Sequence, residues 1–462
     1  MTRPDPNSAN TATTGTPAAP EVEQPVEALA DPTAAPEVAA SLVPPEIVAQ
    51  TLREYARGQV LRIRGGDSGV LPVVLALVVI VIVFQAISPN HVFLSAGNIV
   101  NLFQQSSYFM VFAMAEIFVL LLGEIDLSIG YVGPVGAVIA VQLVQPSTTN
   151  WPWLPAVIVA LIACAVIGAV QGTLVTRLRL PSFIVTLAGL LIFNGVLLIV
   201  LAFGPFSGYP SLGGQKPNPH ALYDWMWGHI SPTGGWIAMA VIVGALGLNS
   251  FLRDTRRRRS GLVAPPLSLT FIKIVFLAAV GVAVVAVCNV NRAHIGTLAG
   301  VPWSIFIVLG VLGAWTFLLG RTRYGRYVYA IGGNAEAARR AGINVNMVRT
   351  VAFVLCSLTA GIAGLLYASY LGGMSNNVPG GQLVLYAVAG AVIGGTSLFG
   401  GRGKIAHGVL GGLVIGGIYN GMYLQQITVQ WQYIVTGLVL LAAVTIDSVS
   451  RRGSMSGSVT RI

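Results

Sequence analysis

Long apolar runs dominate this sequence and constrain its fold more than any other feature. From Val70 onward, runs of roughly 17–24 mostly apolar residues alternate with polar connections. A helix needs about 20 residues to cross the hydrocarbon core of a bilayer, whereas a membrane-spanning strand needs only about 10. Only 9% of the residues are charged, far below the share of about 25% in soluble domains. The sequence therefore predicts an all-α, polytopic transmembrane helical bundle and excludes an ordinary soluble enzyme.

The apolar runs predict about 12 membrane spans, within a range of roughly 10–14, because Gly-rich and re-entrant segments blur the count. The expected division of the chain is a disordered N-terminal tail at 1–60, a transmembrane domain at 61–450 and a short cytoplasmic C-terminal tail at 451–462. The expected spans lie near residues 70–88, 106–122, 129–145, 154–176, 182–203, 235–252, 270–290, 302–320, 349–371, 382–399, 405–423 and 430–447.

The basic residues are distributed asymmetrically over the expected connections. If the N-terminus lies inside, 23 of the 26 Lys and Arg residues fall on inner segments. Only Lys216 and Arg292 fall on outer segments, and Lys273 lies at a span edge. Such a bias is typical of membrane proteins, whose cytoplasmic loops are enriched in Lys and Arg. We therefore expect both termini to be cytoplasmic, and we do not interpret the net charge of +10 as a nucleic-acid surface.

The sequence lacks the patterns of reactive, metal-binding and nucleotide-binding sites. Cys164, Cys288 and Cys356 lie inside apolar runs without CxxC spacing, and the five His residues show no ligand spacing. No GxxxxGK[ST] segment occurs, so the sequence encodes no phosphate-binding loop. We therefore expect no catalytic residues, bound cofactor or metal, and the energy for any transport has to come from a partner or an ion gradient.

The inner connection 321–348 encodes a short helix, expected over Ala335–Ala341. An Asn suits its N-cap, a Glu its first turn, two Arg residues its last turn, and a Gly a left-handed exit. Its Ala-rich surface is small and smooth, so the helix either docks in a groove of another protein or only closes the loop. The candidate docking residues are Gly333, Asn334, Glu336, Ala337, Arg339, Arg340 and Gly342.

Acidic side chains inside or beside the expected spans are candidates for a pathway or gate. Glu116 lies within a span with no basic residue near it in the sequence, and its role is either functional or structural. Glu124 and Asp126 lie at a span end, where an unpaired buried carboxylate costs several kcal/mol. Asp126, helped by Ser128, either caps the following helix or forms part of a gate.

Two further patterns leave alternatives open. Asn194 and Asn420 lie within spans, and they either line a polar pathway or form hydrogen bonds between helices. Residues 123–133 resemble 394–404, and the start of the run at 181 resembles the run at 431, but the two pairs imply different relative orientations. Either the second match is chance, or one segment between 123 and 180 is re-entrant; we favour the re-entrant segment, because broken helices line cavities in transporters.

Four segments, in order along the chain, resemble the sugar permeases of binding-protein-dependent ABC transporters. The resemblance covers about residues 60–450 and is greatest to the xylose permeases, followed by the ribose and other monosaccharide permeases. The segments are GEIDLSIG at 123–130, PSFIVTLAGLLIFNGV at 181–196, YAIGGNAEAARRAGINV at 329–345 and GGTSLFGGRGKIAHGVLGG at 394–412.

The resemblance implies a multi-pass permease subunit of the cell membrane that is not itself an enzyme. Its substrate would be a monosaccharide, with D-xylose as the first choice, delivered by an extracytoplasmic sugar-binding protein. Separate ATPase subunits would use ATP and Mg, and the loop matching Gly333–Val345 would dock on them. A second permease copy would complete the pore as a homodimer. The alternative is an ion-coupled secondary sugar transporter, for which only Glu116 is a candidate coupling acid; a membrane enzyme ranks third.

Overall fold

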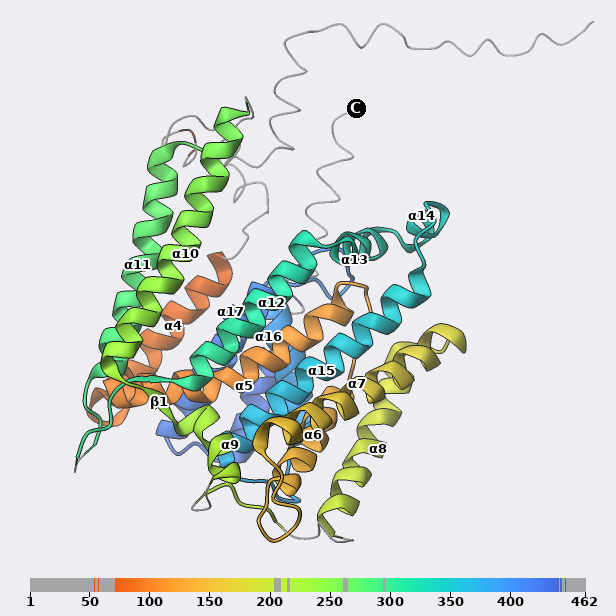
Figure 1. The fold of residues 1–462 in the computed structure, drawn as a ribbon, viewed down its shortest axis with the longest axis horizontal. Helices are drawn as coiled ribbons and strands as arrows, with labels where there is room; N and C mark the ends of the chain where they lie inside the picture. The colour runs from red at the N-terminus through yellow and green to blue at the C-terminus, as the bar shows by residue number, and fades with distance from the viewer. Residues whose placement is uncertain are drawn as a thin grey trace, which may run out of the picture.

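A computed structural model describes residues 54, 57, 71–202, 209–213, 217–260, 265–293, 296–439, 441–442 and 445. These residues are mostly helical (Figure 1). The expected disordered tail, apart from residues 54 and 57, and the expected C-terminal tail lie outside the described residues.

Helices occupy the apolar runs, which confirms the helical, membrane-spanning class. The described residues include three apolar helices of 10–17 residues: α4 (Leu71–Ile87), α6 (Ile129–Leu143) and α16 (Gly380–Ile393). The total of about 12 spans and the location of the termini stay predictions. Eight described helices are long and apolar enough to cross a membrane: α5 (Ala96–Leu120), α7 (Trp153–Arg177), α8 (Ser182–Ala202), α10 (Pro232–Arg259), α11 (Leu267–Asn289), α12 (Trp303–Arg321), α15 (Val345–Leu371) and α17 (Ile405–Leu424).

Helix α5 forms the centre of the bundle and packs against α15, α16 and α17. Of its most apolar 18-residue window, 89% is buried, compared with 11% for α10 and for α11. It begins at Ala96, ten residues before the expected span, because Ser95 caps it and accepts a hydrogen bond from the Asn98 N–H group. By contrast, α10 and α11 pack on each other at one edge of the molecule (Figure 1).

Helices α6 and α16 are short, with 15 and 14 residues. At 1.5 Å per residue each spans about 22 Å, less than the hydrocarbon core of about 30 Å. Their first turns meet inside the bundle: a Cβ atom on Gly130 would lie 2.0 Å from the carbonyl oxygen of Gly380. The Tyr131 hydroxyl donates a hydrogen bond to the Val378 carbonyl, 3.3 Å away. The break before α6 falls where a re-entrant segment is expected.

Short elements join the long helices at their ends. Strands β1 (His229–Ile230) and β2 (Val301–Pro302) pair antiparallel, a small departure from the all-α expectation. This pairing depends on Gly300, whose φ of +119° and missing side chain bring its backbone against the Ile230 carbonyl. The other short elements are η1 (Pro89–Leu94), α9 (Asn218–Trp227), α13 (Arg323–Gly333) and α14 (Ala335–Arg340).

Candidate functional site

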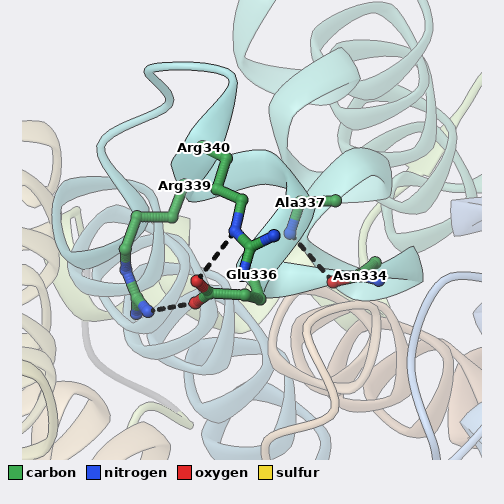
Figure 2. Close-up of polar contacts among 5 residues, drawn as sticks. All are labelled: Asn334, Glu336, Ala337, Arg339 and Arg340. Carbon is green, nitrogen blue, oxygen red and sulfur yellow. Dashed lines mark hydrogen bonds and ion pairs between the residues drawn. The ribbon is translucent and has the colours of Figure 1, made fainter. Parts of the chain in front are cut away.

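Helix α14 is held at its start by the expected cap. The Asn334 side chain accepts a hydrogen bond from the Ala337 N–H group at 2.9 Å. Glu336 follows in the first turn and forms ion pairs with Arg339 at 2.8 Å and Arg340 at 3.3 Å (Figure 2). All three charged side chains are more than half exposed, so each pair contributes only about 0–1 kcal/mol. The charges thus remain accessible to a partner.

The end of α14 is also set by local sequence. The Ile343 N–H group donates to the Ala338 carbonyl, and the Gly342 N–H group donates to the Arg339 carbonyl. This is a Schellman motif, in which Gly342 adopts a φ of +83°. The capping prediction is therefore confirmed, although the helix ends at Arg340, one residue earlier than expected.

Helix α13, which the sequence did not predict, anchors α14 to the bundle. A Cβ atom on Gly332 would lie 1.9 Å from the Leu121 carbonyl oxygen and 2.6 Å from the Gly401 nitrogen. The Tyr329 hydroxyl donates to the Gly403 carbonyl at 2.8 Å, and the Gly401 N–H group donates to the Leu121 carbonyl at 2.9 Å. The two similar segments around 123–133 and 394–404 therefore meet under the loop that carries α14. Gly333, by contrast, has open space around its Cα atom.

A cleft of about 790 Å³ lies beside α14, between the turn that joins α7 to α8 and the start of α15. The α7–α8 turn, which carries the basic residues Arg177 and Arg179, was not among the candidate site segments. The cleft brings Glu124 and Arg339, two candidate residues far apart in the sequence, into one site. Its polar lining is Glu124, Thr176, Arg179, Ser182, Arg339, Asn344, Asn346 and Arg349.

An ion pair crosses this cleft. The Arg349 Nε atom lies 3.3 Å from the Glu124 Oε1 atom, and the two form an ion pair without a hydrogen bond at Nε. The side chains are 28% and 14% exposed, so water screens the pair less than the pairs on α14. The pair links the segment before α6 to the first turns of α15.

We expect the single substitutions Glu124→Arg and Arg349→Glu to destabilise the protein, because each places two like charges side by side in a half-buried site. The double substitution should restore most of the stability, with a coupling energy of about 0.5–3 kcal/mol. The measurement is the Tm of the purified protein for both singles and the double. Additive losses in the double variant would contradict the importance of this pair.

Glu116 and Asp126, the other two acidic candidates for a pathway or gate, are fully buried next to each other. The Glu116 Oε1 atom accepts a hydrogen bond from the Asp126 N–H group at 3.2 Å. Asp126 Oδ1 in turn accepts from the Ser128 N–H group at 2.9 Å and from its hydroxyl at 2.6 Å. Burial raises the pKa of Asp126 to about 6, although the hydrogen bonds from Ser128 oppose the shift. Asp126 therefore holds Ser128, the N-cap residue of α6, but neither side chain accepts a hydrogen bond from an N–H group of the helix, so the expected side-chain cap is not formed. The role of Asp126 in a gate stays a prediction.

The two candidate Asn residues lie apart from these acids in sequence and differ in their surroundings. The Asn98 side chain donates a hydrogen bond to the Asn420 side chain at 2.9 Å, which joins α5 to α17. This contact favours the helix-packing alternative for Asn420. Asn194 lies half-buried on α8, and no described hydrogen bond joins it to the other candidates. Among the described residues, no group of three or more His, Cys, Asp or Glu side chains could hold a metal ion.

Comparison with known sequences identifies related transport proteins. The family described as branched-chain amino acid transport system / permease component matches residues 98–444. The xylose transport system permease protein of Escherichia coli K12 is 35% identical over 391 residues, which cover 83% of this chain and 92% of that protein. The ribose import permease protein of the same strain is 29% identical over 375 residues, covering 81% and 92%. The D-allose transport system permease protein is 29% identical, covering 80% and 89%. No solved structure matches.

Proposed function

This chain belongs to the family of transport-system permease components that includes sugar permeases of ABC importers, and we propose that it is the membrane-spanning subunit of a monosaccharide importer. It is a multi-pass protein of the cell membrane. The first candidate substrate is D-xylose, because the xylose permeases are more similar to it in sequence than the ribose and allose permeases. The partners are an extracytoplasmic binding protein, ATPase subunits and a second copy of this chain.

The observation that carries the proposal is the exposed, doubly capped helix α14 beside a polar cleft. The helix surface is small and hydrogen bonds fix its ends. The preceding helix α13 packs against two turns of the bundle, at Leu121 and Gly401. Closure of an ATPase pair against α14 would therefore push on those turns. Coupling of this kind needs a partner groove that accepts a short Ala-rich helix with basic residues in its last turn.

Uptake into proteoliposomes tests the proposal. The chain is reconstituted with its ATPase and binding protein, and uptake of radiolabelled D-xylose is measured with ATP, with a non-hydrolysable analogue and with a protonophore. We expect uptake to require ATP hydrolysis and to survive the protonophore. Uptake that follows the proton gradient and ignores the ATPase would instead support an ion-coupled transporter, with Glu116 as the coupling acid.

We expect the purified chain alone, reconstituted in lipid, to hydrolyse no ATP above background. The reason is the missing GxxxxGK[ST] segment, without which the backbone offers no cradle for nucleotide phosphates. Phosphate release from ATP is the measurement, with the complete complex as the positive control. Robust turnover by the chain alone would contradict the division of labour between subunits.

A further inference from the structure

Three arginine side chains line the cleft beside α14, and they come from separate segments of the chain. Arg179 lies in the turn between α7 and α8, Arg339 on α14 and Arg349 near the start of α15. Glu124 is the one acid in the described lining, and Arg349 already opposes its charge. Three arginines against one glutamate leave the lining with an excess of positive charge. The cleft is therefore suited to an anion rather than to a neutral sugar.

Two helices begin at the cleft and add to its positive potential. Helix α8 begins at Ser182 and α15 at Val345, and both residues belong to the lining. The first N–H groups of a helix have no partner within it, and this end of the helix dipole is positive. At α15 the Asn344 side chain accepts a hydrogen bond from the Met347 N–H group at 3.0 Å, but no described group accepts one from the N–H groups of Val345 and Asn346. Free backbone donors beside arginine side chains are typical of phosphate sites.

Arg179 has a backbone conformation that ordinarily favours glycine. Its φ is +55°, in the left-handed region, directly after Leu178 at the end of α7. Glycine is common after the end of a helix because a Cβ atom is strained in this conformation. The Arg179 side chain forms no ion pair or hydrogen bond with the described residues. An arginine in place of glycine at the edge of the cleft points to a binding role for its guanidinium group.

Exposed apolar side chains surround Arg179 in the sequence. Leu178 and Phe183 are more than half exposed, and the exposed Leu180 itself lines the cleft. Helix α8 lies at the edge of the bundle, and only 28% of its most apolar window is buried, so its outer face is suited to lipid (Figure 1). The cleft also lies where α7, α8 and α15 end, at the level where these helices leave the hydrocarbon core. A ligand at Arg179 therefore meets positive charge and apolar surface together.

We propose that the cleft binds the phosphate group of an anionic phospholipid, held between Arg179 and Arg339, with the acyl chains along α8. Its volume of about 790 Å³ has room for a headgroup. Basic pockets between membrane-spanning helices on the cytoplasmic side bind such headgroups. Because Arg339 belongs to α14, the lipid ties the docking helix to the α7–α8 turn. Arg340, which pairs with Glu336 and does not line the cleft, stays accessible to the ATPase.

The test measures the Kd of fluorescently labelled phosphatidylglycerol for the purified full chain in a neutral detergent, with phosphatidylcholine as the zwitterionic control. The variants are Arg179→Gly and Arg339→Gln. The matched control is Arg177→Gln, which removes a charge two residues from Arg179 but outside the lining. We expect each cleft variant to weaken binding roughly 10-fold, the effect of losing one charge-assisted contact, and the control to stay within about twofold. Glycine accepts the left-handed backbone, so Arg179→Gly should not lower the Tm.

Soluble competitors distinguish a lipid from a free phosphate. Inorganic phosphate and glycerol 3-phosphate carry the charged group without the acyl chains. We expect neither to displace labelled phosphatidylglycerol at a concentration where unlabelled phosphatidylglycerol displaces it fully. Full displacement by either soluble anion would overturn the lipid and assign the cleft to a free phosphate.

The remaining outcomes each decide the proposal. Equal affinity for phosphatidylcholine, unchanged binding in both cleft variants, or an equal loss in Arg177→Gln would overturn it. Unchanged lipid binding with loss of ATPase co-purification in Arg179→Gly would place an acidic segment of the ATPase in the cleft instead. Should Arg179→Gly lower the Tm, the exposed Arg339 on α14 decides the outcome through Arg339→Gln. Binding is measured without ATPase or sugar, so these results do not depend on the proposed transport function.

Discussion

Replacing Gly342 with Val should abolish most sugar uptake while the protein still reaches the membrane. Gly342 has a φ of +83° and closes the Schellman motif of α14. A β-branched residue in that conformation costs about 1–3 kcal/mol, so the helix exit would rearrange and misplace the docking surface. We expect at least roughly a 10-fold loss of uptake, together with loss of ATPase co-purification, because a shift of about 1.4 kcal/mol already changes binding tenfold.

Two companion variants complete this test. Gly320→Ala, at the end of α12, adds a Cβ atom with nothing within 4 Å and should be neutral. Glu336→Lys reverses an exposed charge and removes both ion pairs, but it costs the helix only about 0.3–1 kcal/mol through its dipole. A large loss of uptake in Glu336→Lys would therefore report on the partner rather than on helix stability. Near-normal uptake by Gly342→Val without bound ATPase would rule out coupling through α14.

The second large effect is expected where the short helices α6 and α16 meet. A Cβ atom on Gly130 would lie 2.0 Å from the Gly380 carbonyl oxygen, and backbone cannot move aside as a flexible side chain can. Gly130→Ala should therefore separate α6 from α16 and cost roughly 1–3 kcal/mol. We expect lower membrane abundance, a lower Tm and strongly reduced uptake.

The matched control for Gly130→Ala is Gly381→Ala, one residue from the contact. A Cβ atom there meets nothing within 4 Å, and the helical backbone of α16 accepts Ala readily. Its Tm and uptake should equal those of the unmodified protein. Equal behaviour of the two variants would show that α6 and α16 do not meet as described.

Features that depend on neighbouring residues were predictable from the sequence. The caps of α14 follow from Asn334 and Gly342, which act within a few residues of the helix they bound. The apolar runs predicted the long helices, because the length and composition of a run are enough to identify a membrane-spanning helix. Local chemistry thus accounts for the helical class and for the shape of the docking helix.

Features that depend on distant residues were not predictable. The contact of Gly130 with Gly380 joins positions about 250 residues apart, and a single sequence shows only that both are glycines. The ion pair of Glu124 with Arg349 is equally remote, so Arg349 was counted only as a basic residue of an inner loop. The stacking of Trp227 on Tyr370 likewise joins residues of α9 and α15, which a single sequence does not place side by side.

The paired strands β1 and β2 have an evolutionary consequence for the α10–α11 hairpin. The chain leaves the bundle at His229–Ile230 and returns at Val301–Pro302, and these two points are hydrogen-bonded to each other. The residues between them could be inserted or deleted as one unit, because the two points of attachment are adjacent and the rest of the chain would keep its path. Most of the hairpin therefore needs only to stay apolar enough for lipid and to keep its two helices packed, whereas Val285 and Cys288 of α11 also pack against Val100 of α5.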